Sequence, residues 1–249
     1  MDLQLSGARV LVTGGTRGIG RAIVEAFVAE GAVVEFCARG ADGCATTAAA
    51  VGGGATGTAV DVGDAAALTS WVEAAAGRLG GIDAVVSNVS ALAIGDGEEN
   101  WRASFEVDLM GAVRLVTAAL PYLIESRGSI VAISSVSGRE IDFTAGPYGV
   151  MKAAIVHYVQ GLAFQLAATG VRANTVSPGN TYFEGGVWHQ IESGQPALYA
   201  ESLALNPTGR MGAPEEMARA VVFLSSPVSS FTSGTNLVVD GALTRGVQL

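Results

Sequence analysis

Residues 9–20 read RVLVTGGTRGIG, and this stretch decides the fold. Its β-branched start, residues 9–13, predicts a strand, its glycines predict a tight turn, and a helical pattern follows over residues 19–30. Gly31 suits the end of that helix, and residues 33–37 predict a second strand. A strand, a glycine turn, a helix and another strand in this order form the repeating unit of parallel α/β sheets.

The same alternation continues along the rest of the chain. Further strands, with helix-length segments between them, are predicted at residues 58–60, 84–87, 129–134, 173–177 and 236–239. We therefore expect an α/β fold with a Rossmann-type, doubly wound parallel sheet of about seven strands and helices on both faces. Because no Pro/Ser linker, charge block or internal repeat interrupts the pattern, residues 1–249 are predicted to form a single domain.

One connection is longer than an ordinary loop. Residues 180–212 are rich in glycine, proline and aromatic residues, and we expect them to form a substrate lid that carries short helices. Tyr182, Phe183, Trp188 and His189 indicate either an apolar or aromatic pocket or the lid's own packing. We expect a structural rather than a catalytic role for His189.

Composition and charge narrow the classes of function. A formal charge of −9 would repel nucleic acid and anionic membrane surfaces. Cys37 and Cys44 are too few for a disulfide framework and lack zinc-site spacing, so we expect a reducing, cytoplasmic location and no metal. The first residues carry an acid where a signal peptide needs positive charge, and the uncharged stretches 43–60 and 153–171 do not resemble membrane helices.

The glycine turn is the first candidate binding site. Glycines let the backbone turn tightly and approach a pyrophosphate, whose charge a helix N-terminus attracts. On this interpretation the contacts to the ligand come from Gly14, Thr16, Arg17, Gly18, Ile19 and Gly20. Glycines that only supply a positive φ are the alternative, and the position between a strand and a helix favours binding.

Three polar side chains form a candidate catalytic group. Tyr148 and Lys152 are four residues apart, so a helix would place both on one face, where an ammonium favours the ionised form of a phenol. Ser135 follows a predicted strand at the carboxyl edge of the sheet, where it could hold a carbonyl oxygen or cap the next element. Proton transfer by the tyrosine is the chemistry that this pattern favours.

Taken in order, these motifs resemble the short-chain dehydrogenase/reductase family along essentially the whole chain, and in particular its 3-oxoacyl-carrier-protein-reductase-like carbonyl reductases. Residues 13–20 resemble the family's TGxxxGxG and residues 148–152 its YxxxK, with Ser135 at the spacing that the family's serine keeps. The remaining matches are Asp61-Val62, Ser177-Pro178-Gly179 and Val239-Asp240-Gly241.

The resemblance implies hydride transfer between a nicotinamide and a carbonyl or alcohol carbon. Tyr148 would be the general acid, Ser135 would bind the carbonyl oxygen, and Lys152 would bind the nicotinamide ribose while assisting the tyrosine. Further cofactor contacts are implied for Asp61, Val62, Asn88, Pro178, Gly179 and Thr181. The family's usual threonine lies two residues after Thr181, where this chain has Phe183.

Two segments depart from the family pattern. Residues 87–90 read SNVS where the family has NNAG, which places Ser90 beside the nicotinamide half. Asp108 replaces the asparagine of VNL and would be an acidic fourth catalytic residue. Because an ionised carboxylate only accepts hydrogen bonds, we expect Ser90 or a rearranged backbone to supply a donor. A protonated Asp108 that mimics the amide is the alternative.

Cofactor preference and assembly can also be predicted. Where NAD enzymes carry an acid after the second strand, this chain has Ala38 and Arg39, and Arg17 lies in the glycine turn. Two guanidinium groups suit a 2′-phosphate, which predicts NADP(H). The predicted helix is uncharged over residues 153–168, and the resemblance implies a homotetramer in which this helix and the one near Asp108 meet their symmetry mates.

The leading functional prediction is NADPH-dependent reduction of a small ketone or of a 3-oxoacyl or polyketide-like chain. A dehydrogenase that oxidises a secondary alcohol would use the same residues. A cofactor-binding sensor or scaffold with weakened catalysis is the third hypothesis, and it is motivated by Asp108 and Ser90. The expected partner of an enzyme is a small-molecule carbonyl or alcohol, with no role for nucleic acid or membrane.

Overall fold

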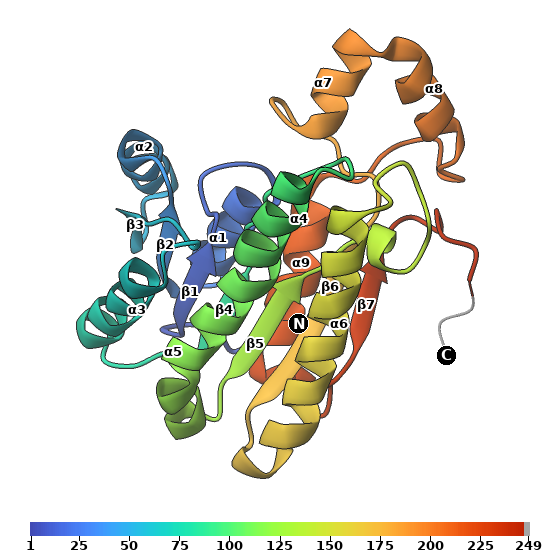
Figure 1. The fold of residues 1–249 in the computed structure, drawn as a ribbon. Coiled ribbons are helices and arrows are strands. Elements are labelled where there is room, and N and C mark those ends of the chain that lie inside the picture. The colour runs from blue at the N-terminus through green and yellow to red at the C-terminus, as the bar shows by residue number, and fades with distance from the viewer. Residues whose placement is uncertain (247–249) are drawn as a thin grey trace.

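A computed structural model describes residues 1–246, and within them seven strands form one parallel sheet in the order β3-β2-β1-β4-β5-β6-β7 (Figure 1). The strands are β1 Arg9–Thr13, β2 Val33–Ala38, β3 Ala55–Ala59, β4 Ala84–Ser87, β5 Ser129–Ile133, β6 Arg172–Pro178 and β7 Asn236–Val239. The predicted α/β fold with a parallel sheet is therefore confirmed. The predicted domain extends over residues 247–249, which lie outside the described residues.

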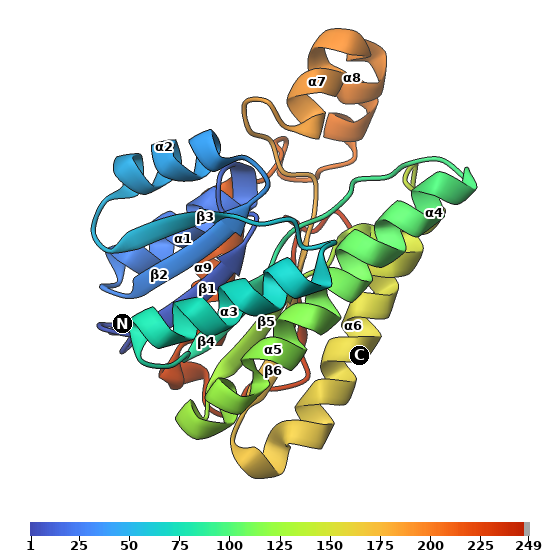
Figure 2. The ribbon, with the colours of Figure 1, turned by 60° about the vertical axis from the view of Figure 1, so that its left-hand side comes forward.

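Helices cover both faces of the sheet, as Figures 1 and 2 show. Helices α3, α5 and α6 pack on one face, and α1, α2 and α9 on the other, each group with its own buried apolar cluster. Their bounds are α1 Gly18–Ala29, α2 Ala41–Val51, α3 Ala65–Leu79, α4 Glu98–Ser104, α5 Gly111–Ser126, α6 Pro147–Leu166, α7 Val187–Gly194, α8 Pro196–Ala204 and α9 Pro214–Ser225. A π-helical turn, η1 (Phe105–Met110), joins α4 to α5.

The strand order reverses at β1, which lies between β2 and β4. Val10 pairs with Val34 on one side and with Ala84 on the other. The connections that follow β1 and β4 therefore leave the sheet on opposite sides and open a crevice at the carboxyl edge, where open α/β sheets bind their ligands. The glycine turn after β1 lies at this crevice.

The third strand differs most from its prediction. Residues 58–60 were expected, whereas β3 is Ala55–Ala59. Its sequence, ATGTA, has no large apolar side chain and gives little local signal. Its position follows from its pairing with β2, in which Val34 lies opposite Ala55 and Ala38 opposite Ala59. Tertiary pairing, not propensity, decides this strand.

Residues 180–212 project from the carboxyl edge of the sheet and carry α7 and α8 (Figures 1 and 2). The short helices expected in this segment are thus present. Its base is held by a single bridge between Thr181 and Gly212, where the Tyr182 N–H also donates to the Gly212 carbonyl at 2.9 Å. We call residues 180–212 the lid segment.

One helical run within the described residues, Glu98–Ser126, is long and apolar enough to cross a membrane by length and composition. This run, which the sequence analysis did not single out, comprises α4, η1 and α5. Its inner side packs against α3 and β4.

A buried carboxylate connects the sheet to α3. Glu35 lies in β2 with 3% of its surface exposed, and it accepts two hydrogen bonds from Arg78 at 2.7 Å each. These hydrogen bonds raise the pKa of Arg78. Because a buried carboxylate without a partner is costly, this two-point contact should contribute to stability more than surface ion pairs do.

We predict that Arg78→Ala lowers the free energy of unfolding by about 1–3 kcal/mol, because Glu35 is left buried without its donors. Urea unfolding at neutral pH measures the loss. Arg21→Ala is the matched control: in its ion pair with Glu25 on α1 both side chains are 43% exposed, and its loss should cost below about 0.5 kcal/mol. Equal losses in the two variants would contradict the prediction.

Candidate active site

The turn between β1 and α1 presents free backbone N–H groups at the crevice. Helix α1 begins at Gly18, its N-cap Arg17 makes no side-chain cap bond, and its first turn contains no acid. Gly18 has a φ of +52°, a conformation that favours glycine. A Cβ on Gly20 would lie 2.0 Å from the Gly14 carbonyl oxygen, so the close approach of helix and turn also requires glycine. Such a turn can hold an anionic group against the helix N-terminus.

Asn88, at the end of β4, shapes this turn. Its side-chain amide donates to the carbonyls of Thr13 at 3.2 Å and Gly14 at 3.3 Å. Its backbone N–H donates to Thr13 Oγ1 at 3.0 Å. Asn88 was predicted as a cofactor contact, and the structure commits its amide to the strand–turn junction. These hydrogen bonds hold the turn in place, and the contact of Asn88 with a cofactor stays a prediction.

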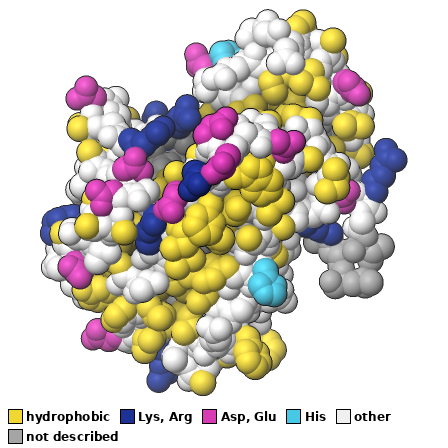
Figure 3. Space-filling model, in the orientation of Figure 1, with side chains coloured by type: hydrophobic (Ala, Val, Ile, Leu, Met, Phe, Trp, Pro, Cys, Tyr) yellow, Lys and Arg dark blue, Asp and Glu magenta, His cyan; other side chains and the backbone are white. Residues whose placement is uncertain are grey.

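Two arginines flank the turn on the side of α2. Arg39 follows β2 directly, Arg17 lies in the turn, and both side chains are exposed. Within residues 1–246 neither forms an ion pair. Figure 3 shows Lys and Arg side chains gathered where Figure 1 shows the β1–α1 turn and α2. The acid that follows β3, Asp61, is turned into its own loop and accepts from the Gly63 N–H at 2.9 Å.

Three further residues near the β1–α1 turn were predicted to contact the cofactor, and each makes packing or hydrogen-bond contacts within the protein. Val62 is buried against Gly111 at the start of α5. Thr16 lies in the turn, where its carbonyl accepts from Thr47 Oγ1 at 3.4 Å. Ile19 is half-buried in the first turn of α1. The ligand contacts of all three stay predictions.

Helix α6 carries Tyr148 and Lys152 on one face. Pro147 begins the helix, and Tyr148 follows directly. The Lys152 ammonium lies 5.5 Å from the centroid of the Tyr148 ring, one helical turn away. The structure thus confirms that the two side chains share one face of α6.

The end of β5 fastens this helix in position. The Lys152 ammonium donates to the Ile133 carbonyl at 3.1 Å, and Ser134 Oγ donates to the Lys152 carbonyl at 2.8 Å. Ser135 follows immediately, so the same anchor sets the distance from the serine to α6. Ser134 thus makes a positioning contact between the end of β5 and α6.

Ser135 caps a short helical turn and also belongs to a chain of hydroxyls. Its Oγ accepts from the Ser137 N–H at 3.1 Å and donates to Ser137 Oγ at 3.2 Å. Ser137 Oγ in turn donates to the Asp142 carboxylate at 2.6 Å. The capping alternative is therefore realised, and the contact of Ser135 with a carbonyl oxygen stays a prediction. Sequence reasoning missed Ser137 and Asp142, because an irregular loop offers no periodic signal.

Asp108 lies in η1 with 1% of its surface exposed and faces the same lysine. One carboxylate oxygen is 3.3 Å from the Lys152 ammonium, and the other accepts from the Ala91 N–H at 2.9 Å. Ser90 does not supply this donor, because its hydroxyl accepts from the Leu92 N–H at 3.1 Å. Of the two donors expected for Asp108, the one present in the structure is a backbone N–H, that of Ala91.

The segment after β6 leads into the lid. Its start is held to β7, where the Gly179 N–H donates to the Val239 carbonyl at 3.0 Å, and Pro178 ends β6. Thr181 Oγ1 donates to the Gly179 carbonyl at 3.0 Å, so its hydroxyl is engaged within the turn. The Phe183 ring lies directly against Gly18, and a Cβ on Gly18 would be 2.5 Å from it. Phe183 thus covers the glycine turn, a contact that only the fold reveals.

The lid aromatics pack mainly on one another and on the neighbouring loop. Trp188 meets Phe143 of the β5–α6 loop edge to face, with ring centroids 5.6 Å apart. Tyr182 packs against His189, whose Nδ1 accepts from the Gly185 N–H at 3.2 Å. His189 therefore has the structural contacts expected of it, and Trp188 joins the lid to the loop after Ser135.

The donor set fits a dinucleotide. Free N–H groups and positive-φ glycines suit a pyrophosphate, the exposed arginines suit an additional phosphate, and the Lys152 ammonium suits ribose hydroxyls. Tyr148 lies on α6 and Ser135 follows β5, and the hydrogen bond of Ser134 joins these two elements. Both residues lie on the other side of the glycine turn from Arg17 and Arg39. Such an arrangement can hold a carbonyl oxygen and move a proton to or from it.

Comparison with known proteins agrees with this arrangement. A family described as enoyl-(acyl carrier protein) reductase matches residues 14–244. Isoepoxydon dehydrogenase of Penicillium expansum is 43% identical over 98% of this chain and 97% of its own. L-fucose dehydrogenase of Mus musculus is 36% identical over 98% and 90%, and a 3-oxoacyl-[acyl-carrier-protein] reductase of Vibrio harveyi is 31% identical over 97% and 99%.

A solved structure supports the same relationship. A crystal structure described as a short-chain dehydrogenase/reductase from Burkholderia xenovorans superimposes with a TM-score of 0.90 and 32% identity, over 96% of this chain and 97% of that one. The fold, the order of the motifs and these similarities agree along the whole chain. The protein therefore belongs to the short-chain dehydrogenase/reductase family and is an oxidoreductase that acts on alcohol or carbonyl groups with a nicotinamide cofactor.

Proposed function

We propose that this protein reduces a ketone with NADPH, with Tyr148 as the proton donor. The observation that carries the proposal is the position of Tyr148 and Lys152 on one face of α6, fastened to the strand end that leads into Ser135. The bound cofactor supplies the hydride. This chain's residues then have to hold the carbonyl oxygen and deliver one proton to it.

Each residue has a role that suits its chemistry. Ser135 donates a hydrogen bond to the carbonyl oxygen and polarises the bond. Tyr148 donates its phenolic proton to the same oxygen as negative charge develops there. The Lys152 ammonium, 5.5 Å from the ring centroid, stabilises the phenolate that remains. The intact set of three speaks against the hypothesis of a sensor or scaffold with weakened catalysis.

The residues at the carboxyl end of β2 favour NADP(H) as the cofactor. A 2′-phosphate needs cations near the adenosine ribose, and Arg39 and Arg17 are both exposed there without an ion-pair partner among residues 1–246. Ala38 ends β2 where an acid would repel the phosphate. Free guanidinium groups retain all their donors for a bidentate contact.

Oxidation of a secondary alcohol is the second candidate, and the names of two relatives favour it. Proteins 43% and 36% identical to this chain are described as dehydrogenases of isoepoxydon and of L-fucose. The chain of hydroxyls from Ser135 through Ser137 to Asp142 gives the site a polar wall. We infer that a hydroxylated small molecule suits this wall better than a long acyl chain does.

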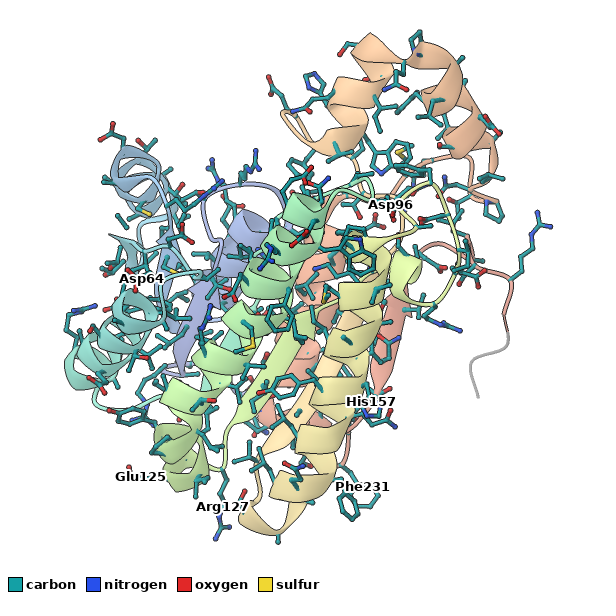
Figure 4. The ribbon with its side chains drawn as sticks, in the orientation of Figure 1. Asp64, Asp96, Glu125, Arg127, His157 and Phe231 are labelled. Carbon is teal, nitrogen blue, oxygen red and sulfur yellow. The ribbon has the colours of Figure 1, made fainter. Side chains whose placement is uncertain are left out.

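We also propose a homotetramer in the cytoplasm. Two free, buried cysteines suit a reducing compartment. Figure 3 shows a broad hydrophobic surface over α5 and α6, and Figure 4 places Asp96 at one end of this face and Glu125 and Arg127 at the other. Exposed apolar side chains of η1, α5 and α6 include Phe105, Ile124, Val150 and Phe164. A patch of this kind is covered in stable proteins by a symmetry mate.

Tyr148→Phe is predicted to lower kcat by about 10²–10⁴-fold with little change in cofactor affinity, because only the transferable proton is removed. Turnover is measured by NADPH absorbance over a panel of small ketones, and affinity by NADPH fluorescence. Tyr122→Phe, a half-buried tyrosine of α5, is the control and should retain activity. Wild-type turnover by Tyr148→Phe would exclude the proposed proton donor.

Arg39→Ala is predicted to raise the Kd for NADPH at least about tenfold and to leave that for NADH nearly unchanged, because it removes a charge-assisted contact to the phosphate. Fluorescence titration with both cofactors measures the ratio. The control is Arg102→Ala on α4, whose arginine is exposed and paired with Glu98. If wild-type protein preferred NADH, the cofactor assignment would fail.

Phe164→Asp is predicted to dissociate the tetramer, because it places a charge on an 87% exposed ring of α6 inside the proposed interface. Sedimentation velocity at micromolar concentration measures the assembly. Ala74→Asp, on the exposed side of α3, is the control and should stay tetrameric. A monomeric wild-type protein would refute the assembly.

A further inference from the structure

The β5–α6 loop connects Ser135, the residue proposed to bind the carbonyl oxygen, to a carboxylate through one further hydroxyl. Ser135 Oγ lies 3.2 Å from Ser137 Oγ, which lies 2.6 Å from Asp142 Oδ2. On its other side, Asp142 Oδ1 accepts from the N–H of Thr144 at 2.8 Å and from its hydroxyl at 2.7 Å. Both oxygens of this carboxylate are therefore engaged by donors.

The carboxylate fixes the direction in which these hydroxyls donate. Asp142 is partly exposed, and a carboxylate in contact with water is ionised near neutral pH and can only accept. Ser137 has a single proton, which goes to Asp142. In the contact between the two serines the proton must then come from Ser135, and the Ser137 oxygen is the acceptor. The chain thus presents an acceptor next to Ser135.

Close packing places Ser137 beside the proposed proton donor. The turn that carries Ser137 packs on the start of α6. A Cβ on Gly149, the residue after Tyr148, would lie 2.9 Å from the Ser137 carbonyl oxygen. A Cβ on Gly138 would lie 2.8 Å from the backbone nitrogen of Ala153. The turn is therefore fixed against the part of α6 that carries Tyr148.

Binding of a carbonyl changes the hydrogen bonds of this chain. Ser135 has one proton, so when it donates to a ketone oxygen it can no longer donate to Ser137. The Ser137 oxygen then lacks a donor, because its own proton is held by Asp142. The nearby Ser137 N–H is already committed to Ser135 at 3.1 Å. A hydroxyl group of the substrate can supply the missing hydrogen bond.

The spacing of the two serines places that hydroxyl next to the reacting carbonyl. Ser135 Oγ and Ser137 Oγ are 3.2 Å apart, so two substrate oxygens that bind them must also lie close together. Oxygens on adjacent carbon atoms meet this condition without folding the substrate back on itself. A plain acyl chain offers no donor at this position.

We propose that Ser137 is a specificity-determining residue that accepts a hydrogen bond from a hydroxyl on the carbon next to the substrate carbonyl, and that Asp142 is the positioning residue that fixes its polarity. The substrate class is an α-hydroxyketone, or a vicinal diol when the reaction runs as an oxidation. The carbonyl carbon still receives the hydride and its oxygen the Tyr148 proton, while the neighbouring hydroxyl keeps its own. The inference deepens the proposed function and rests on Ser135 as the residue that binds the carbonyl.

Two pairs of ketones of matched size test the polarity of the chain in the wild-type enzyme. Hydroxyacetone and butanone differ by a hydroxyl in place of a methyl group. Methoxyacetone and 2-pentanone place an oxygen at the same position without a proton, which also controls for the inductive effect of that oxygen. NADPH absorbance gives kcat/KM for each ketone. We expect hydroxyacetone to exceed butanone at least about tenfold and methoxyacetone not to exceed 2-pentanone, because Ser137 can only accept.

Two variants assign the preference to these residues. In Ser137→Ala the acceptor is lost, so the hydroxyacetone-to-butanone ratio should fall to that of the methoxy pair. In Asp142→Asn the Thr144 N–H holds the amide oxygen at the Oδ1 position, so the NH₂ group faces Ser137. Ser137 then accepts from the amide and turns its own proton toward the site. Methoxyacetone should therefore gain relative to 2-pentanone in this variant.

The matched control is Glu140→Gln, which removes a charge from the same loop and should keep both wild-type ratios. A purely structural role of the loop would lower all four kcat/KM values together and leave the ratios unchanged, and that result in both variants overturns the inference. Circular dichroism and thermal melts verify that the variants are folded. The wild-type comparison decides the proposal even where a variant does not fold.

The outcomes separate this inference from the proposed function. If the wild type reduces hydroxyacetone and butanone equally well, the role of Ser137 is overturned and ketone reduction by Tyr148 stands. An equal gain from the methoxy and the hydroxyl group also overturns it, because the oxygen would then act through its inductive effect. Full turnover by Tyr148→Phe removes the proposed function, whatever the preference among the ketones.

Discussion

The buried ammonium of Lys152 is the constraint on which the site depends. A charge with 2% exposure must have partners, and it finds them in the Ile133 carbonyl at the end of β5 and the Asp108 carboxylate of η1. These contacts join α6, β5 and the α4–α5 run at one point. These contacts fix the elements that carry Tyr148 and Ser135 relative to each other. The contacts that compensate the buried charge of Lys152 therefore also position the catalytic side chains.

A second constraint acts on the other side of the crevice. Where the sheet order reverses between β1 and β4, Asn88 bonds to the carbonyls of Thr13 and Gly14 and holds the glycine turn open. The free N–H groups of α1 then face the crevice, as an anionic cofactor requires. The Phe183 ring, resting on Gly18, brings the lid segment onto the same turn. Cofactor binding and lid position therefore share one surface.

The two departures from the family pattern, at Asp108 and in the segment after β4, are in contact with each other. A carboxylate at position 108 accepts from the Ala91 N–H and meets an ammonium, which an amide could not do with both its groups. The chain that supplies this N–H contains Leu92 at a positive φ, an unusual conformation for leucine. The Ala91–Asp108 hydrogen bond thus joins the backbone after β4 to the acid in η1, whereas Ser90 accepts from the Leu92 N–H within its own turn.

Local sequence signals determined much of this protein. The β-branched run before the glycine turn, the alternation of strands and helices and the Tyr148–Lys152 spacing predicted the parallel sheet and the shared face of α6, because backbone period and turn chemistry are encoded locally. Only the tertiary structure decided the bounds of β3, the partner of Asp108, the anchoring by Ser134 and the contact of Phe183 with Gly18. These depend on atoms distant in sequence, whose distances follow from packing and from the pairing of buried polar groups.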